Sequence, residues 1–398
     1  MWQSHNIELM EKRGAKKKKR KPKLNRRQTR KKRKKTQKAS KEGKTFDFQA
    51  RKIKIKVLGI GGGGNSIVSA IAPKLKKIKF VAVNTDLQNL RKLTKVVEKF
   101  QFGEKLTRGL GTGMDVNLAE KAALEESEKI KNIFQGQDLS IFISALGGGT
   151  GSGAAPVFAK IAKDLKNYTI GIFTLPFSFE GEKRQDIARF ALESIKPYLN
   201  TFIIFPNEKV FQIISPQTPL QEAFAAINKI LTENLEGLIE ILYVPGLINI
   251  DFADVKTILS GKGKLSFLNT IEVQGERRAE EGAKKILENP FYEYSPRGAE
   301  KILFNITGGK DLKITEVEKI SSAIFNSNKK AKIIFGISEN EKYKDKIKIT
   351  LLAVGCKEIS QAKEGKLEKP KTFPKGKTLQ IEKKIVKVVK KLKKRPSF

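Results

Sequence analysis

Gly147-Gly148-Gly149-Thr150-Gly151-Ser152-Gly153 is the stretch of this 398-residue chain that decides its fold. It follows the apolar run Leu139–Ala145, and a helical pattern of apolar residues begins at Ala155. A strand, a tight glycine turn and a helix in that order bring bare backbone N–H groups and the positive end of a helix dipole together, which suits a phosphate group. A flexible Gly/Ser linker is the alternative, but linkers lack such flanking elements. The stretch therefore predicts a phosphate-binding turn.

Apolar strand-like runs and amphipathic helical patterns alternate along the first half of the chain. This alternation predicts a parallel sheet covered by helices on both faces. The expected strands are 53–60, 80–84, 139–145, 168–175 and 201–206, and the expected helices are 65–77, 118–132, 155–165 and 185–196. A long amphipathic helix is expected at 220–242, followed by strands at 301–307, 332–336 and 346–354 and helices at 276–288 and 314–326.

These elements predict an α/β fold with a doubly wound, mostly parallel sheet, a long central helix and a smaller α+β C-terminal domain. Five regions are expected along the chain. They are a basic disordered extension (1–50), a domain that holds the glycine turn (51–219), the central helix (220–245), a C-terminal domain with an acidic loop (246–356) and a basic tail (357–398).

The formal net charge of +38 is concentrated at the two ends of the chain. Residues 11–44 hold 20 Lys and Arg against 2 acidic residues, and residues 357–398 hold 15 against 4. Runs such as KKKKRKPK and RKKRKK repel themselves and cannot bury apolar area, so residues 1–50 are expected to be disordered. The N-terminal run either stays solvated without a partner or contacts nucleic acid or another anionic surface.

Several functional classes are excluded by composition. The only cysteine, Cys356, allows no disulfide within the chain, which agrees with a reducing cytoplasm. The only histidine, His5, lies in the polar leader, so histidine catalysis in the folded core is excluded. No apolar stretch reaches the roughly 20 residues of a membrane span, and the N-terminus lacks the apolar region of a secretory signal.

Two further glycine-rich segments bear on the ligand. Gly59–Asn65 fits the pattern G-x-G-x-x-G, and Asp86 lies where a ribose-binding acid of a nicotinamide enzyme would lie. Arg108–Gly113 is the third segment, unless it is an ordinary turn. Three glycine segments favour a triphosphate over a dinucleotide, and the lack of G-x-x-x-x-G-K-[ST] excludes a P-loop nucleotidase.

An acidic motif, Asn249-Ile250-Asp251-Phe252-Ala253-Asp254, follows the long helix. Two carboxylates three positions apart at the start of a helix share one face. They are suited to orienting a water molecule for attack on a phosphate group. The alternative is a purely structural helix cap, in which Asp251 closes the helix N-terminus and Asp254 completes the first turn.

The order and spacing of seven motifs resemble the FtsZ family of tubulin-like bacterial division GTPases. The resemblance runs from about Ile53 to Val354, and it is carried by KVLGIGGGGN, VAVNTD, GEKLTRGLGTG, GGGTGSG, LPFSFEGEKR, PGLINIDFADVKTIL and NITGG. It implies that residues 51–219 bind GTP and that the chain hydrolyses GTP and polymerises. A GTP-binding scaffold that does not hydrolyse is the alternative, which the intact Asp251 and Asp254 disfavour.

The resemblance also implies a set of binding residues. Phe224 would stack on the guanine and Asn228 would bind its edge, and the two share one helix face because they are four positions apart. Without the resemblance, Phe224 reads as a core residue and Asn228 as a solvated one. The implied GTP-binding residues are Gly61, Gly62, Gly63, Gly64, Asn65, Gly111, Thr112, Gly113, Gly147, Gly148, Gly149, Thr150, Gly151, Ser152, Gly153, Glu180, Arg184, Asn207, Phe224 and Asn228.

The implied catalytic residues are Asp251, Asp254 and Asn249. Ligands of open α/β sheets bind at the carboxyl ends of the strands, and a helix of about 20 residues spans about 30 Å. The acids are therefore expected at the opposite pole from the nucleotide, within reach of a neighbouring subunit stacked head to tail, so that hydrolysis depends on assembly. Such a contact does not close, so it extends into a filament. Mg2+ is expected through the nucleotide phosphates.

The resemblance further implies a cytoplasmic protein at the division site, near the inner face of the membrane, with membrane adaptor proteins as partners. Two segments depart from the family pattern. Residues 261–267 are lysine-rich instead of small, and this leaves polymer dynamics open. Residues 381–395 show a basic amphipathic helical pattern in place of the usual acidic adaptor peptide. This pattern suits an anionic membrane or an acidic groove of a partner, unless the tail is a frayed, solvated segment.

Overall fold

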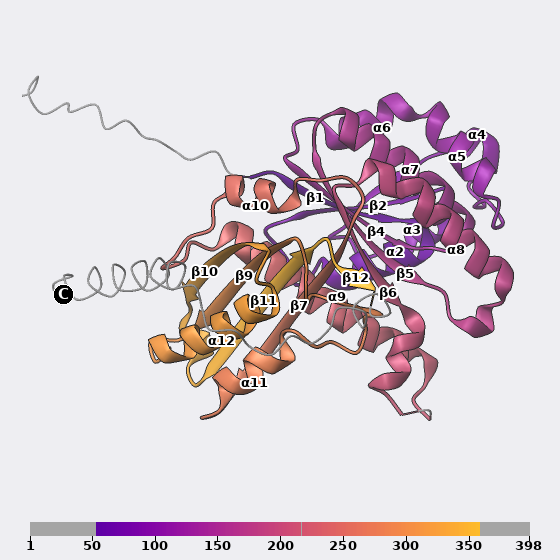
Figure 1. The fold of residues 1–398 in the computed structure, drawn as a ribbon. Coiled ribbons are helices and arrows are strands. Elements are labelled where there is room, and N and C mark those ends of the chain that lie inside the picture. Colours follow the sequence, from indigo (N-terminus) through magenta and orange to yellow (C-terminus); the bar gives the residue numbers. More distant parts are fainter. Residues whose placement is uncertain (1–52, 216, 359–398) are drawn as a thin grey trace, which may run out of the picture. The chain divides into compact units, whose positions relative to one another are not determined.

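The computed structural model of the chain describes residues 53–215 and 217–358 (Figure 1). The predictions for residues 1–50 and 381–395 lie outside these residues. No helix within the described part is long and apolar enough to cross a membrane.

The fold is built on one ten-stranded sheet with the order β10-β9-β11-β7-β6-β5-β4-β1-β2-β3. Neighbours from β6 to β3 are parallel, and β11 runs antiparallel to both β7 and β9. The predicted doubly wound, mostly parallel sheet is thereby confirmed. The strands are β1 Ile55–Ile60, β2 Lys79–Asn84, β3 Glu98–Gln101, β4 Leu139–Ala145, β5 Tyr168–Leu175, β6 Thr201–Pro206, β7 Lys264–Gln274, β9 Lys301–Gly308, β10 Lys332–Glu339 and β11 Lys346–Val354, with β8 Tyr294–Ser295 and β12 Lys357–Glu358 as a separate pair.

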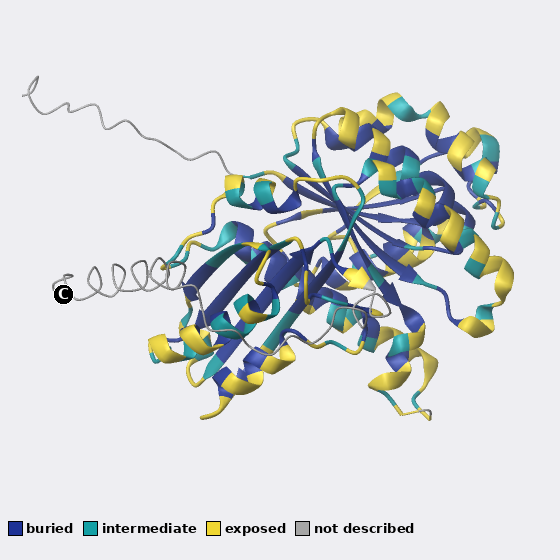
Figure 2. Ribbon diagram, viewed as in Figure 1, coloured by how far each residue is buried: buried dark blue, intermediate teal, exposed yellow. Residues whose placement is uncertain are grey.

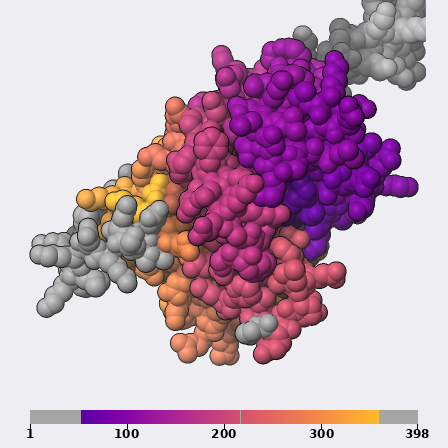
Figure 3. All heavy atoms as spheres, turned by 90° about the vertical axis from the view of Figure 1, so that its right-hand side faces the viewer, coloured from indigo at the N-terminus to yellow at the C-terminus, as the bar shows by residue number. Residues whose placement is uncertain are grey.

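Helices cover the sheet, and α9 is the long central helix that the sequence predicts. The described α-helices are α2 Gly61–Ile71, α3 Leu87–Arg91, α4 Glu104–Thr107, α5 Val116–Glu125, α6 Ser127–Phe134, α7 Gly149–Asp164, α8 Glu182–Ile195, α9 Leu220–Tyr243, α10 Phe252–Leu259, α11 Arg278–Lys285 and α12 Ile314–Ser327. In the space-filling view the magenta middle of the chain lies between the purple N-terminal and the orange C-terminal parts of the described residues (Figure 3).

The parallel strands are buried on both faces. Consecutive residues of β1 belong to different cores, because Val57 packs with α2 and α9 residues whereas Leu58 packs with α5–α8 residues. Burial of both faces explains why β1, β4 and β5 are mostly apolar, and in Figure 2 they are dark except at the ends of β4 and β5. The outward faces of the helices are exposed (Figure 2).

The structure corrects several predicted elements. Helices α2 and α7 begin within the glycine segments, at Gly61 and Gly149, instead of after them. The predicted helix 118–132 is two helices that meet at Glu126, whose carboxylate accepts a hydrogen bond from the backbone N–H of Gly103 at 2.9 Å. Strand β7, which the sequence did not predict, begins inside the atypical segment 261–267 and joins β6 to β11.

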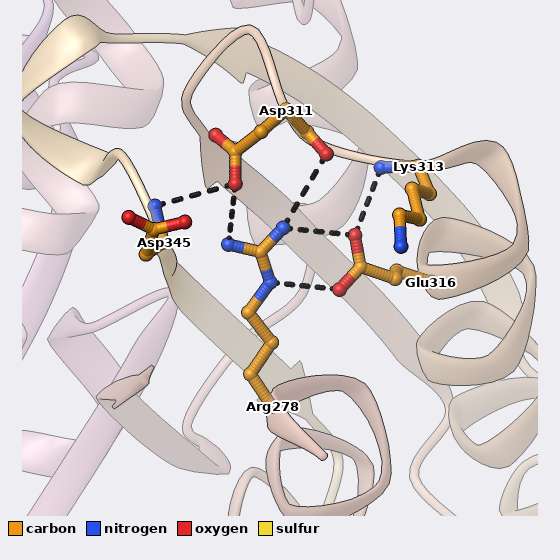
Figure 4. A network of polar contacts seen from close by, with 5 residues as sticks. All are labelled: Arg278, Asp311, Lys313, Glu316 and Asp345. Carbon is orange, nitrogen blue, oxygen red and sulfur yellow. Dashed lines mark hydrogen bonds and ion pairs between the residues drawn. The ribbon is translucent and has the colours of Figure 1, made fainter. Parts of the chain in front are cut away.

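An ion-pair network ties α11 to α12 (Figure 4). The nearly buried guanidinium of Arg278 contacts Glu316 at 2.7 Å and Asp311 at 2.8 Å. The backbone N–H groups of Lys313 and Asp345 donate to the same two carboxylates. Arg278 thereby fixes the loop between β9 and α12 against the start of α11.

Candidate functional site

A cavity of about 450 Å³ opens at the carboxyl ends of the parallel strands. The segments that follow β1, β2, β4, β5 and β6 all contribute to its lining, which is where open α/β sheets bind ligands. The lining residues are Gly61, Gly62, Gly63, Asn84, Asp86, Asn89, Leu110, Gly111, Thr112, Gly113, Met114, Ala145, Leu146, Gly148, Gly149, Thr150, Gly151, Pro176, Glu180, Arg184, Asn207 and Phe224.

Two helix N-termini face this cavity with their backbone N–H groups uncapped. Helix α2 follows Ile60 and α7 follows Gly148, and neither residue supplies a side-chain cap. The first N–H groups of a helix have no partner within the helix, and they carry the positive end of its dipole. Two such ends at one cavity make a strong site for an anion such as a polyphosphate.

The glycines allow the loops to approach one another closely. A Cβ added at Gly61 would lie 2.7 Å from the backbone nitrogen of Gly151, and a Cβ at Gly149 would lie 2.2 Å from the Thr112 hydroxyl oxygen. Side chains at these positions would separate the three glycine segments. The three segments therefore meet around one cavity, here called the cradle.

The opposite wall of the cavity is aromatic and charged. The ring of Phe224 is 42% exposed and packs edge-on against Phe177 with a centroid distance of 5.8 Å. Arg184 pairs with Glu180 at 2.5 Å, and Glu180 also accepts the backbone N–H of Phe177 at 2.9 Å. Phe224 is thus a cavity residue and not the core residue of the alternative interpretation. This wall offers a stacking surface and polar groups beside the anion site.

Not every predicted binding residue lines the cavity. Gly147 and Ser152 serve the turn itself, because the Gly147 N–H donates to the Ser152 hydroxyl at 3.0 Å. A Cβ at Gly153 would lie 2.1 Å from the carbonyl oxygen of Val116, so Gly153 permits the packing of α7 against α5. The predicted residues that the lining does not include are Gly64, Asn65, Gly147, Ser152, Gly153 and Asn228.

Asn84 and Asn89 line the cavity and were missed. Asn84 ends β2 directly after the apolar run Phe80–Val83, and a polar residue at the carboxyl end of such a run is a signal that points to it. Asn89 lies on the short helix α3, which the sequence did not predict.

The acidic motif lies outside the cavity, at the start of α10. The Asp251 carboxylate accepts the Asp254 N–H at 2.8 Å, and the Asp254 carboxylate accepts the Asp251 N–H at 3.3 Å, which is a reciprocal helix cap. The Asn249 side chain accepts the Gly246 N–H at 3.3 Å. Asp251 and Asn249 are exposed. The predicted cap is therefore present, and the carboxylates remain at the surface.

Helix α9 separates the two features. It begins near the cavity, where Phe224 lies in its first turns, and its C-terminal end leads through residues 244–250 to the acidic motif. Its 24 residues span about 36 Å at 1.5 Å per residue. In Figure 1, α10 lies at the left of the ribbon and α3 and α8 lie at the right.

Comparison with known proteins agrees with this geometry. Residues 54–215 match the tubulin/FtsZ GTPase domain and residues 265–357 match the FtsZ C-terminal domain. An empty FtsZ dimer from M. jannaschii is 32% identical, with a TM-score of 0.70, over 86% of this chain and 99% of that one. A point mutant of M. jannaschii FtsZ is 34% identical, with a TM-score of 0.69, over 83% of this chain and 95% of that one.

A more distant structure shares the fold alone. CetZ2 from Haloferax volcanii, in a GTPγS-bound protofilament, is 20% identical with a TM-score of 0.66, over 77% of this chain and 94% of that one. The GTPase-domain match includes the Gly59–Asn65 segment and Asp86, so the nicotinamide interpretation of those residues is wrong. The chain belongs to the tubulin/FtsZ family and is a GTPase.

Proposed function

We propose that this GTPase polymerises head to tail into filaments and that each hydrolytic centre forms between two subunits. One observation carries the proposal: the nucleotide-sized cavity and the paired acids Asp251 and Asp254 belong to opposite ends of α9. Helix α9 is about 36 Å long, so Asp251 and Asp254 beyond its C-terminal end cannot reach a phosphate group that is bound at its N-terminal end. The acids of a neighbouring subunit can.

Within the cavity, the uncapped N-termini of α2 and α7 hold the phosphates and Phe224 stacks on the guanine. Glu180 and Arg184 bind the ribose side, and Asn207 lies on the same wall. The neighbour's Asp251 and Asp254 orient the attacking water, with Asn249 beside them. A protein accelerates phosphoryl transfer mainly by positioning the reactants and by stabilising charge. In this proposal the cavity of one subunit binds the phosphates and the acids of the next subunit position the water.

Mg2+ fits this arrangement as a partner of the nucleotide phosphates. Within residues 53–215 and 217–358, no group of three or more His, Cys, Asp and Glu side chains is placed to hold a metal ion by itself. The cavity does offer oxygen donors of the kind Mg2+ prefers, namely the Asp86 carboxylate and the Thr112 and Thr150 hydroxyls. When bound, Mg2+ offsets phosphate charge.

Self-association of this type has support from related structures. The M. jannaschii FtsZ structure is a dimer, and the Haloferax volcanii CetZ2 structure is a protofilament. A contact between the cavity face of one subunit and the acidic end of the next uses two different surfaces. Such a heterologous contact leaves one of each surface free at the ends, so it propagates.

The cellular role that we propose is a cytoplasmic division ring near the inner face of the membrane, reached through membrane adaptor proteins. The tail residues 381–395 would add direct contact with anionic lipid, and residues 11–44 would add salt-sensitive contact with nucleic acid or another anionic surface. Liposome sedimentation of the full chain and of a chain ending at Cys356 tests the tail. Equal pelleting of both would remove it from the proposal.

Phosphate release and light scattering, measured together over a range of protein concentrations, test the filament mechanism. We expect GTP hydrolysis per subunit to appear only at concentrations where scattering reports assembly. Asp251→Ala should bind GTP with wild-type affinity and release little phosphate. Full turnover by dilute wild-type subunits that form no oligomer would refute the shared hydrolytic centre.

A further inference from the structure

Four polar side chains at and behind the cavity wall form a hydrogen-bonded chain in which Asn84 and Asn89 have no role in the function described above. It consists of Asn65 on α2, Asn84 at the end of β2, Asp86 in the following turn and Asn89 on α3. The Nδ2 of Asn84 donates to Oδ1 of Asn89 at 3.2 Å, and the Nδ2 of Asn65 approaches the same oxygen at 3.5 Å. The Asn89 N–H donates to Asp86 Oδ1 at 3.0 Å, which caps α3.

The backbone determines which way these amides point. The N–H of Asp86 donates to Oδ1 of Asn84 at 3.2 Å, so the oxygen of Asn84 faces its own turn and its NH2 group faces Asn89. An NH2 group needs an acceptor. Asn89 must therefore present Oδ1 to Asn84, and its own NH2 group is directed to the other side.

That NH2 group is an unused donor at the anion cradle. Among the described residues, no acceptor bonds to Nδ2 of Asn89. A Cβ added at Gly62 would have this nitrogen as its only neighbour within 4 Å, at 3.6 Å. Asn89 and Gly62 both line the cavity, and Gly62 lies in the first turn of α2. The amide is thus held beside an uncapped helix N-terminus, with its oxygen occupied and its donor free.

We propose that Asn89 is a phosphate-binding residue whose side-chain NH2 group donates to a phosphate oxygen of the bound guanine nucleotide. Asn84 and Asn65 act as positioning residues, because they hold the Asn89 oxygen and so orient the donor. The inference rests on the proposed placement of the nucleotide in this cavity. It adds a side-chain donor on α3 to the backbone donors of α2 and α7.

Asn89→Asp is the sharpest test, because it keeps the oxygen that Asn84 and Asn65 bind and replaces the donor by a second oxygen. The new carboxylate lies in the first turn of α3, where negative charge is tolerated, so the fold should be retained. A hydrogen bond to a charged group accounts for roughly a tenfold to hundredfold change in affinity. We expect GDP and GTP to bind the full-length variant at least about tenfold more weakly, and guanosine to bind as it does to the wild-type chain.

Asn132→Asp is the matched control, since it makes the same charge change on the exposed surface of α6, outside the cavity lining. It should bind all three ligands like the wild-type chain. Unchanged GDP and GTP affinity in Asn89→Asp would overturn the inference, and so would an equal loss of guanosine binding, which would indicate a structural role. Hydrogen exchange of the wild-type chain, with and without bound guanine nucleotide, tests the placement of the site separately. If the nucleotide binds but does not slow exchange at the backbone amides of Asn89 and Gly62, the placement of the nucleotide in this cavity is wrong, and the inference fails with it.

Discussion

Asp251 has two separable jobs in the proposed mechanism, and two substitutions distinguish them. Its Oδ1 accepts the Asp254 N–H at 2.8 Å and caps α10, and its negative charge is proposed to act on a neighbouring subunit's water. Asp251→Asn keeps a cap oxygen of the same reach and removes the charge. Asp251→Ala removes both. A structural role and a catalytic role therefore predict different rankings of the two variants.

The cap sets the expected size of the stability effect. Loss of a good N-cap residue costs roughly 1 kcal/mol, whereas an Asp-to-Asn exchange at the cap costs only the dipole contribution of the charge, about 0.3–1 kcal/mol. Asp251→Ala should therefore lower the free energy of unfolding by about 1 kcal/mol in urea titrations, and Asp251→Asn by less. Both should lose most GTP hydrolysis, in phosphate-release assays run above the assembly concentration, while nucleotide affinity stays unchanged.

Comparing GTP hydrolysis with the free energy of unfolding in the two variants distinguishes a capping role of Asp251 from a catalytic one. If Asp251→Asn hydrolyses GTP at the wild-type rate and only Asp251→Ala is impaired, Asp251 is a helix cap and the catalytic assignment is wrong. If Asp251→Asn fails to assemble, the comparison is repeated in mixtures with wild-type subunits. Hydrolysis should then fall in proportion to the variant fraction, because each variant disables one junction.

Two further predictions concern the glycine turn and the ion-pair network. Gly153→Ala forces a Cβ to within 2.1 Å of the Val116 carbonyl oxygen and should destabilise the fold by about 1–3 kcal/mol. Gly148→Ala places its methyl group in open space at the cavity and should reduce nucleotide affinity with little change in Tm. The reverse pattern in thermal melts and nucleotide titrations would contradict the assignment of Gly153 to packing and of Gly148 to the cavity. Arg278→Ala leaves the largely buried Glu316 without its partner and should destabilise the fold by about 3 kcal/mol, with partial recovery in Arg278→Ala/Glu316→Ala. Burial acts to raise the pKa of Glu316, but hydrogen bonds from Arg278 and the Lys313 N–H outweigh it and hold that pKa below its ordinary value. A hydrogen bond from Arg278 also lowers the pKa of Asp311. Since the folded-state values are depressed, this stabilisation is complete above the ordinary carboxyl pKa near 4 and is lost as the pH falls through the folded values, so wild-type and Arg278→Ala melts should converge in acid.

Strongly apolar strands could be located from the sequence, and the glycine-started helices could not. The predicted bounds of β4, β5, β6 and β11 agree with the structure, because these strands are mostly apolar and buried and so stand out from the loops that flank them. Helices α2 and α7 begin at glycines, which are poor helix formers, because the close approach of Gly61 to Gly151 leaves no room for side chains. Only the folded structure contains that approach.

The site residues divide along similar lines. Loop glycines were predictable from spacing, but the division between cradle glycines such as Gly148 and packing glycines such as Gly153 depends on what lies opposite each one. Asn89 was missed because its significance comes from a hydrogen-bond chain that begins at the backbone of Asp86. Strand β3 was missed because it is a short edge strand, Glu98–Gln101, in which only Phe100 is apolar.

The reciprocal cap of Asp251 and Asp254 reconciles the structural and catalytic interpretations of the acidic motif. Each carboxylate uses one oxygen for the cap, Oδ1 of Asp251 and Oδ2 of Asp254, and within the described residues no hydrogen bond reaches the other oxygen of either group. The cap therefore fixes the orientation of both carboxylates and leaves one acceptor on each free. Acceptors that are rigid before the phosphate arrives need no reorganisation when a water molecule must be held in line with it. In the proposed mechanism, the cap holds both acids ready for the phosphate of a neighbouring subunit. Loosening α10 by truncating Val255 or Ile258, which lie on its buried face, should therefore lower hydrolysis in phosphate-release assays without changing either acid.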